Sequence, residues 1–239
     1  KYIERGGNLM FMGEPSHREA QNKVLGKFLG LELTPLLVGP DVRFKGTLPT
    51  ANLLATVPTQ RVKDLMYQMK STYRIAHENC AGIEQVEDKG FKVEAFLKTD
   101  TIGPVWTELE TTDFVDDTVK FNPAVGEVSK VFNTAVGLTR QVGNKEQRIM
   151  VTGDADCLSN NEFVITRGVS AANGNLLAGC ALWMSYGEVP LDTRRPDTKD
   201  STVSISMAWY RIFKAGFKFG LPILLLGCGV FIWFRRRGR

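Results

Sequence analysis

Short apolar runs and longer amphipathic stretches alternate along the first part of the chain. Three apolar runs bounded by turn residues predict buried strands, at 8–13, 36–38 and 53–57. Helical spacing of apolar residues predicts one helix that Ser16 caps and another over 62–69. The order of a helix end, two glycines, a strand, a turn and a helix is typical of right-handed α/β winding. We therefore predict an α/β fold with a mixed, partly parallel sheet and flanking helices.

The pattern changes at Ser71, where short alternating segments and acidic loops indicate a β-rich insertion around 71–125. Beyond it, alternating segments at 135–142 and 147–152 flank a Gly-Asn pair, which predicts a β-hairpin. A broad apolar face after Asn175 predicts a further helix. All of these elements fall within 1–205, which we expect to form the α/β domain.

The most apolar part of the chain is the uncharged run 219–234, which three arginines follow directly. As a helix it would extend ~24 Å, or ~34 Å if it begins at Ile212, against a hydrocarbon core of ~30 Å. Aromatic residues flank the run, as they do at membrane interfaces. We expect a linker and transmembrane helix over 206–234 and a basic tail at 235–239. The alternative is a buried core helix with a basic end.

The net charge indicates which partners the chain could bind. It is +4, and the four arginines among the last five residues account for all of it. The rest of the chain has no basic excess for a phosphate backbone, so we expect no nucleic-acid partner. The positive-inside rule places the arginine tail in the cytoplasm and residues 1–205 outside it. Lys1 falls in what reads as the last turn of a helix, so we expect a piece of a longer protein.

Polar residues concentrate between 151 and 161, directly after a predicted strand, where α/β proteins place ligands. The predicted ligand or partner contacts are Asp154, Asp156, Ser159, Asn160 and Asn161. Such side chains also favour caps and turns, and closely spaced carboxylates could hold a hard cation. Because the glycine and distal glutamate of an EF-hand loop are missing, we expect mainly turn stabilisation, with no metal and no cofactor. Arg194 and Arg195 are either a solvated linker or a contact with a neighbouring membrane subunit.

Catalytic signatures are mostly missing from the sequence. The stretch 168–172 lacks the second glycine of G-x-S-x-G, and Ala81 stands where H-E-x-x-H needs its second histidine. Nothing in the sequence places His17 or His77 beside a nucleophile, so we expect both to be solvated. The four cysteines have no metal-site spacing and argue against a disulfide scaffold. We therefore expect no enzymatic activity.

One block of the chain is specific enough to indicate a family. Residues 138–160 read LTRQVGNKEQRIMVTGDADCLSN. They resemble the "LTR…QRI-V-GDADFLSN" signature of the auxiliary component of ABC transporters associated with gliding motility. Segments 2–13, 175–183 and 190–196 and the proline-containing C-terminal helix follow in the family's order. The resemblance thus spans most of the chain, and Cys157 replaces the family's usual aromatic residue.

The resemblance implies an extracytoplasmic, periplasmic α/β domain of the glutamine-amidotransferase-like or flavodoxin-like class, without the catalytic Cys and His. It implies partners, an ABC permease and an ATPase of the bacterial inner membrane, and a binding or coupling role without chemistry. It assigns no transported substrate and no catalytic residue. Two alternatives stay open: an extracytoplasmic receptor domain for a sugar or a peptide, and an amidotransferase-like or hydrolytic enzyme.

Overall fold

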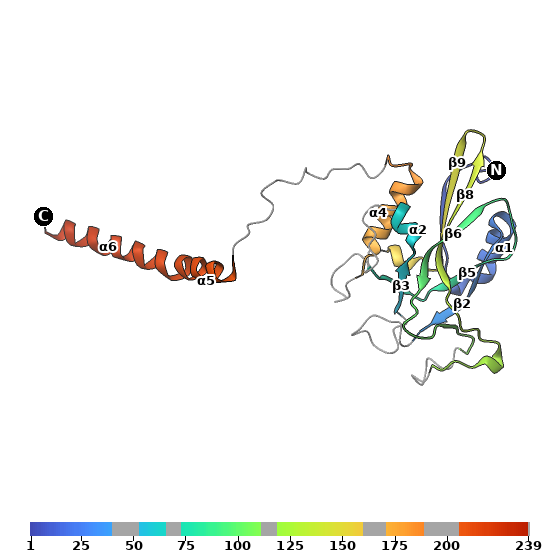
Figure 1. The fold of residues 1–239 in the computed structure, drawn as a ribbon, viewed down its shortest axis with the longest axis horizontal. Coiled ribbons are helices and arrows are strands. Elements are labelled where there is room, and N and C mark those ends of the chain that lie inside the picture. Colours follow the sequence, from blue (N-terminus) through green and yellow to red (C-terminus); the bar gives the residue numbers. More distant parts are fainter. Residues whose placement is uncertain (40–52, 66–72, 111–118, 160–170, 189–205, 239) are drawn as a thin grey trace. The chain divides into compact units, whose positions relative to one another are not determined.

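The computed structural model describes residues 1–39, 53–65, 73–110, 119–159, 171–188 and 206–238. The chain divides into two compact units, Lys1–Asp192 and Thr193–Arg239. The first unit carries a sheet with helices, and the second carries the C-terminal helix (Figure 1).

The first unit begins with a strand and a helix and then continues mostly as strands. Its strands are β1 (Leu9–Met12), β2 (Leu31–Val38), β3 (Leu53–Pro58), β4 (Ile75–Glu78), β5 (Ala81–Gln85), β6 (Lys92–Thr99), β7 (Trp106–Thr107), β8 (Asn133–Val142) and β9 (Lys145–Thr152). Its helices are α1 (Arg18–Leu29), α2 (Gln60–Leu65) and α4 (Asn173–Met184), with 3₁₀ turns η1 (Pro15–His17), η3 (Pro123–Val125) and η4 (Asp156–Leu158). The predicted hairpin is confirmed, since β8 and β9 pair from Val142 opposite Lys145.

The strands form one largely antiparallel sheet. Within the described residues, β4-β3-β6-β8-β5-β2-β7 are neighbours in that order, and β9 pairs with β8 and β1. The pair β1–β9 is parallel, with Leu9 opposite Ile149, and the other pairs are antiparallel. The predicted strand at 8–13 is confirmed, but a parallel sheet of the amidotransferase-like or flavodoxin-like class is not supported. Short hairpin connections join antiparallel neighbours, whereas parallel neighbours need long crossovers.

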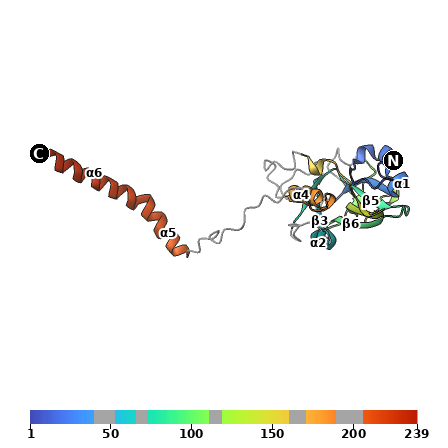
Figure 2. The same cartoon turned by 90° about the horizontal axis from the view of Figure 1, so that it is seen from above.

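Helices cover both faces of the sheet, as predicted. Figure 1 shows α1 on one side and α2 with α4 on the other, and Figure 2 shows the same unit from above. The core on the α1 side consists of Leu25, Leu29, Leu31, Leu33, Ala81, Ile83, Phe91, Val136, Leu138, Ile149 and Val151. The core on the α4 side consists of Val62, Ile75, Phe96, Leu97, Ala135, Met150, Ala172, Leu176, Cys180 and Trp183. Successive residues of β8 and β9 thus enter opposite cores.

The sheet bends back on itself because β4 and β5 are two arms of one interrupted strand. Asn79 and Cys80 alone separate them, and Asn79 has a left-handed φ of 60°. Four inter-strand steps of a flat sheet would place β4 and β5 ~19 Å apart, yet the chain between Glu78 and Ala81 reaches at most ~11 Å. The curvature brings the end of β4 towards the end of β9, where the Ala81 amide donates to the carbonyl of Gly153 at 2.8 Å.

Two helix starts differ from prediction. His17, not Ser16, is the N-cap of α1, and it makes no side-chain cap bond, so the predicted cap is wrong. The Ser16 hydroxyl donates instead to Glu14 Oε1 at 3.1 Å. α4 begins at Asn173 rather than Asn175. Neither helix has a side-chain cap bond at its N-cap residue, so the cap signal that places a helix start in a sequence is missing from both.

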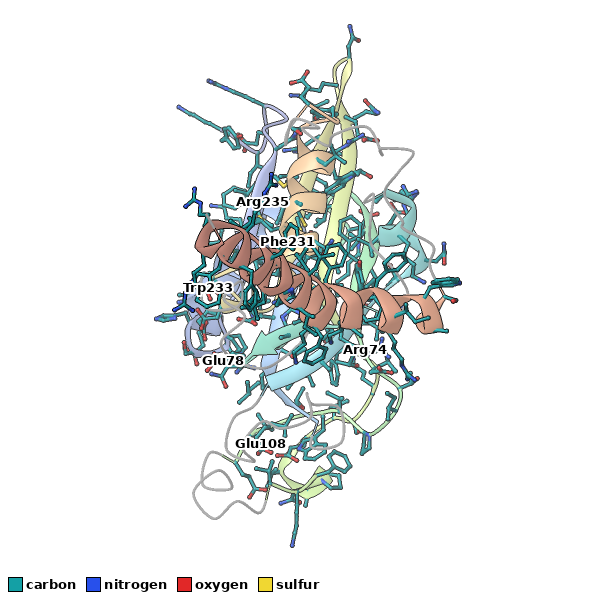
Figure 3. The ribbon with its side chains drawn as sticks, turned by 90° about the vertical axis from the view of Figure 1, so that its left-hand side faces the viewer. Arg74, Glu78, Glu108, Phe231, Trp233 and Arg235 are labelled. Atoms are coloured by element: carbon teal, nitrogen blue, oxygen red, sulfur yellow. The ribbon has the colours of Figure 1, made fainter. Side chains whose placement is uncertain are left out.

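The described part of the second unit, residues 206–238, forms one helix with a π-helical turn. α5 (Met207–Ala215), the π-turn Gly216–Gly220 and α6 (Leu221–Arg237) are continuous, and 30 residues from Ala208 to Arg237 are long and apolar enough to cross a membrane. The π-turn ends two residues before Pro222, which has no amide proton for an α-helical bond to the preceding turn. The side chains of Phe231 and Trp233 extend outward from this helix (Figure 3). The predicted apolar C-terminal helix is confirmed.

A glycine in β8 should be essential for packing under α4. A Cβ on Gly137 would lie 2.0 Å from Phe96 Cζ, and the Phe96 ring packs edge-on against Trp183 at 5.0 Å between centroids. We expect Gly137→Ala to lower the free energy of unfolding by ~1–3 kcal/mol, because overpacking forces the ring out of place. The measurement is thermal unfolding of the full chain in detergent.

The double variant Gly137→Ala/Phe96→Leu is the control. Leu is smaller than Phe and leaves room for the new methyl group. The double variant should therefore lose less free energy of unfolding than the sum of the losses of the two single variants. Additive losses would contradict the assignment of Phe96 as the obstacle.

Candidate functional site

The GDAD block begins where β9 ends, and a glycine is required there. The Gly153 amide donates to the Thr134 carbonyl at 2.8 Å, and the Gly153 carbonyl accepts from the Ala81 amide, also at 2.8 Å. A Cβ on Gly153 would lie 1.8 Å from the carbonyl oxygen of Ala81. Only glycine fits between the two strands, and this close contact directs Asp154 into the interior.

Asp154 is fully buried and stabilises the turn that follows β9. One carboxylate oxygen, Oδ1, accepts from the backbone amide of Asp156 at 2.8 Å, an Asx-type turn bond. The Asp154 carbonyl accepts from the Thr152 hydroxyl at 2.9 Å and from the Cys157 thiol at 3.2 Å. The turn-stabilising role expected from the sequence is therefore present at Asp154, and it uses only one of the two carboxylate oxygens.

His77 on β4 faces the other carboxylate oxygen. His77 Nδ1 lies 3.2 Å from Asp154 Oδ2, and both side chains are 0% exposed. The pair is within ion-pair distance but is not aligned as a hydrogen bond, and no described residue bonds either ring nitrogen or Oδ2. The expectation that His77 is solvated is wrong. Curvature of the sheet brings β4 to the end of β9, and the sequence pattern did not reveal that contact.

Asn173 ties these elements together and was missed by the sequence analysis. Its amide nitrogen donates to the carbonyls of Ala76 at 2.8 Å and Cys157 at 2.7 Å, and its amide oxygen accepts from the Ala76 amide at 2.9 Å. This fully buried side chain therefore links β4, η4 and the start of α4. The signal that could have found it is a polar residue beside glycine at the head of an apolar run.

Two buried cysteines lie with this group. Cys157, in η4, is 0% exposed, as is Cys80 at the break between β4 and β5. Burial raises the pKa of the Cys80 thiol well above its usual value, and nearby Asp154, Cys157 and Glu14 raise it further. Cys80 is therefore a neutral thiol rather than a thiolate at neutral pH, and it has little nucleophilic character.

The other predicted contact residues lie apart from this buried cluster or outside the described residues. Asp156 is exposed, and Ser159 is half-buried with its amide donating to the Asp156 carbonyl at 2.8 Å. The remaining predicted contacts, Asn160, Asn161, Arg194 and Arg195, lie outside the described residues. The structure therefore separates the two aspartates of the block, with Asp154 in the core and Asp156 facing solvent.

A serine and a histidine are in contact on the surface before α1. Ser16 Oγ lies 3.0 Å from His17 Nδ1. The sequence had given no sign that His17 contacts a hydroxyl group. The Ser16 hydroxyl also lies 3.1 Å from Glu14 Oε1, to which it can donate, and the donor in the Ser16–His17 contact depends on the tautomer of the ring. Glu14 therefore competes with His17 for the serine proton.

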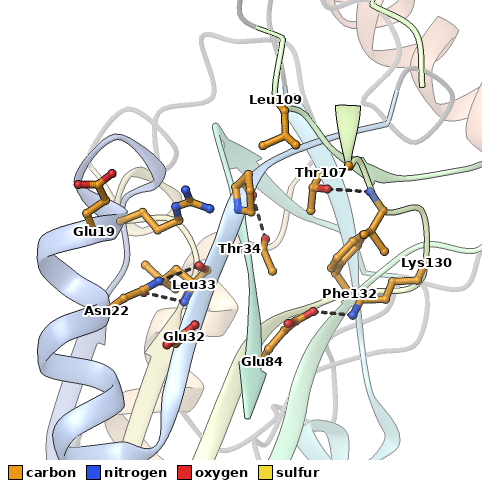
Figure 4. Close-up of a pocket in the computed structure, with 14 residues that line it drawn as sticks. Glu19, Asn22, Glu32, Leu33, Thr34, Glu84, Thr107, Leu109, Lys130 and Phe132 are labelled. Carbon is orange, nitrogen blue, oxygen red and sulfur yellow. Dashed lines mark hydrogen bonds and ion pairs between the residues drawn. The ribbon is translucent and has the colours of Figure 1, made fainter. Parts of the chain in front are cut away.

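An open groove runs beside α1 and β2 (Figure 4). Its volume is about 570 Å³, and its lining includes cationic Arg18 and Lys130, acidic Glu32 and Glu84, and apolar Phe132. Lys130 forms an ion pair with Glu84 at one side of the groove. The lining is mixed in charge, which suits a polar ligand or a protein surface better than an apolar molecule.

The two aspartates of the GDAD block should contribute unequally to stability. We expect Asp154→Ala to lower the free energy of unfolding by ~2 kcal/mol, because it removes a buried turn bond and leaves His77 facing a void. Asp156→Ala should change it by less than ~0.5 kcal/mol, since the exposed side chain is lost but the Asp156 amide remains. Thermal unfolding of both variants checks this, and equal losses would contradict the buried assignment of Asp154.

Comparison with models of known protein families gives no match to this chain, and comparison with curated proteins gives none either. Among solved structures, a chain described as "mmIFT52 N-terminal domain" aligns over 80% of this chain and 70% of its own length. The aligned residues are 14% identical and the TM-score is 0.46. A similarity at this level carries no argument about the function of the protein.

Proposed function

We propose that this protein is a membrane-anchored accessory component of an ABC transport system. Its first unit would lie outside the cytoplasm, on the periplasmic side of a bacterial inner membrane, and would bind or couple without chemistry of its own. Its partners would be an ABC permease and an ATPase. The observation that carries the proposal is the C-terminal helix, and the GDAD block supplies the resemblance to transporter auxiliary components.

The C-terminal helix has the length and surface of a membrane span. Thirty residues at ~1.5 Å each give ~45 Å, enough to cross a hydrocarbon core of ~30 Å. Its most apolar window has a mean hydropathy of 1.9, and none of that window is buried. Leu226 and Phe231, for example, are 70% and 68% exposed. Such a surface is costly in water, and lipid or a partner helix would cover it.

Charges and aromatic rings mark both ends of the span. Lys214 lies over the Tyr210 ring at 5.9 Å, and Arg237 lies over the Trp233 ring at 4.7 Å. Aromatic rings and long basic side chains are common at membrane interfaces, because the ring and the alkyl stem can lie in the apolar region while the charged group reaches water. The cluster at Arg235–Arg237 favours the cytoplasmic side for the C-terminal end.

The proposed absence of chemistry is supported by the buried state of the reactive groups. His77, Asp154, Cys157 and Cys80 are all 0% exposed, so no substrate reaches them in this conformation. An amidotransferase-like or hydrolytic activity would need an accessible nucleophile beside a base. Among the described residues the nearest exposed arrangement is Ser16 with His17, and there Glu14 competes with His17 for the serine proton.

The groove beside α1 favours a second candidate, a receptor domain for a sugar or a peptide. Its charged lining residues, which include Arg18, Glu32 and the ion-paired Lys130 and Glu84, could bind polar groups of such a ligand. Figure 4 shows the Lys130–Glu84 pair at this groove. Saturable binding of a small sugar or peptide that Arg18→Ala abolishes would favour this candidate over a protein-coupling role.

The side of the membrane on which each unit lies can be tested by cysteine labelling in intact bacterial cells. Lys23→Cys places a thiol on an exposed position of α1, and Gly238→Cys places one in the basic tail. An impermeant maleimide should label the first variant in intact cells and the second only after lysis. The protein must stay with the membranes through an alkaline carbonate wash.

The unsubstituted chain is the matched control, because three of its cysteines are buried and Cys228 lies within the proposed span. The reverse labelling pattern would place the first unit in the cytoplasm and overturn the extracytoplasmic assignment.

The transport role predicts a defined set of partners. A tagged full chain, purified in mild detergent from its native membranes, should retain a multispanning permease and a P-loop ATPase in comparable molar amounts, identified by mass spectrometry. Replacing Ala208–Arg237 with an unrelated transmembrane helix should reduce the recovery of both, if the span contacts the permease. Arg194→Ala/Arg195→Ala tests the predicted subunit contact in the same assay. Purification of the chain alone, or with proteins of other classes, would contradict the proposal.

A further inference from the structure

The interior of the first unit holds three metal-ligating side chains in mutual reach. His77 on β4, Asp154 after β9 and Cys157 in η4 each offer one ligand atom, and these atoms all lie within 4.8 Å of one another. All three side chains are 0% exposed. Asp154 and Cys157 are three residues apart in one turn, and the fold brings His77 to them from a strand distant in the sequence.

This cluster leaves polar atoms without hydrogen bonds in the core. No described residue forms a hydrogen bond with either ring nitrogen of His77 or with Oδ2 of Asp154. Buried polar atoms are nearly always bonded, and an exception indicates a missing water or ion. His77 Nδ1 and Asp154 Oδ2 approach to 3.2 Å without hydrogen-bond alignment. A cation placed between these two atoms could accept an electron pair from each of them.

We propose that His77, Asp154 and Cys157 bind a divalent zinc ion. Nitrogen, sulfur and carboxylate oxygen together are donors that zinc accepts, whereas calcium and magnesium take oxygen. Bonds of ~2.0–2.3 Å in a tetrahedral site would place the donor atoms ~3.3–3.8 Å apart. The donor atoms lie within 4.8 Å of one another, so they need to approach by ~1.5 Å at most, which small side-chain rotations can supply. The site does not depend on the proposed transport role.

The surroundings hold the ligands in place. Asp154 Oδ1 is fixed by the Asp156 amide at 2.8 Å, which leaves Oδ2 directed to His77. Asn173 bonds the carbonyl of Cys157 itself and both backbone groups of Ala76, the neighbour of His77. Outer bonds of this kind orient metal ligands and are needed for affinity. The strands and η4 are therefore held in register before an ion binds.

A bound cation would compensate the buried carboxylate of Asp154. A buried carboxylate without a full set of partners is costly, and a divalent cation would balance its charge together with that of the Cys157 thiolate. Binding releases the Cys157 proton, because the thiolate is the ligand.

The test is metal analysis of the full chain. The protein is expressed in minimal medium supplemented with zinc or with cobalt, so that the site fills during folding, and is purified in detergent under reducing conditions. We expect about one zinc per chain after desalting. The cobalt form should show a near-ultraviolet thiolate-to-cobalt band and the intense visible bands of tetrahedral cobalt. Removing zinc with a chelator should lower the melting temperature by several degrees, and adding zinc, but not calcium or magnesium, should restore it.

Matched cysteine variants assign the ligand. Cys157→Ala should lose the metal and the thiolate band. Cys180→Ala, at a buried cysteine on α4 that contacts Met150 of β9, should keep both. Asp154→Asn keeps the acceptor for the Asp156 amide and should lower the zinc content several-fold. A wild-type protein without stoichiometric zinc and without a thiolate–cobalt band overturns the proposal, whether or not the variants fold. Equal metal in wild type and Cys157→Ala overturns it as well.

Discussion

The two-sided burial of the β8–β9 hairpin is the constraint on which the first unit depends. Val136 and Leu138 of β8 enter the core beneath α1, and Ala135 enters the core beneath α4. Gly137 leaves room there for the ring of Phe96. Because both faces of the hairpin are covered, it links the two cores and positions every strand that pairs with it. Loss of packing on either face would therefore loosen both.

The same hairpin leads into the buried cluster, and the curvature of the sheet completes it. β9 ends at Gly153, where contact with Ala81 leaves no room for a side chain, and Asp154 turns inward. The interruption at Asn79 lets β4 return to this point with His77. Asn173 then forms hydrogen bonds with the backbone of Ala76 on β4 and of Cys157 in η4. The hairpin, the strand break and the start of α4 thus meet at one buried cluster, in which His77, Asp154 and Asn173 are fully buried.

The C-terminal helix differs from the elements of the sheet in what covers its apolar side chains. None of its most apolar window is buried, so a lipid or protein environment would be needed to cover it. The apolar side chains of the two cores are, by contrast, covered by the strands and helices of the first unit. This difference is consistent with the membrane anchoring that we propose for the helix.

Sequence patterns alone determined the features that depend on neighbouring residues. The C-terminal helix is visible because its apolar run is long and uninterrupted, and the hairpin is visible because Gly143-Asn144 supplies its turn. The sheet was predicted to be partly parallel, but β1–β9 is the one parallel pair among the described strands, and the predicted strands at 36–38 and 53–57 pair antiparallel. Helices on both faces make buried antiparallel strands as apolar as parallel ones, so the apolar runs carried no signal of strand direction. Only the tertiary structure decided that His77 meets Asp154. That contact depends on a curved sheet joining residues 77 positions apart in the sequence, and residue spacing carries no signal of it.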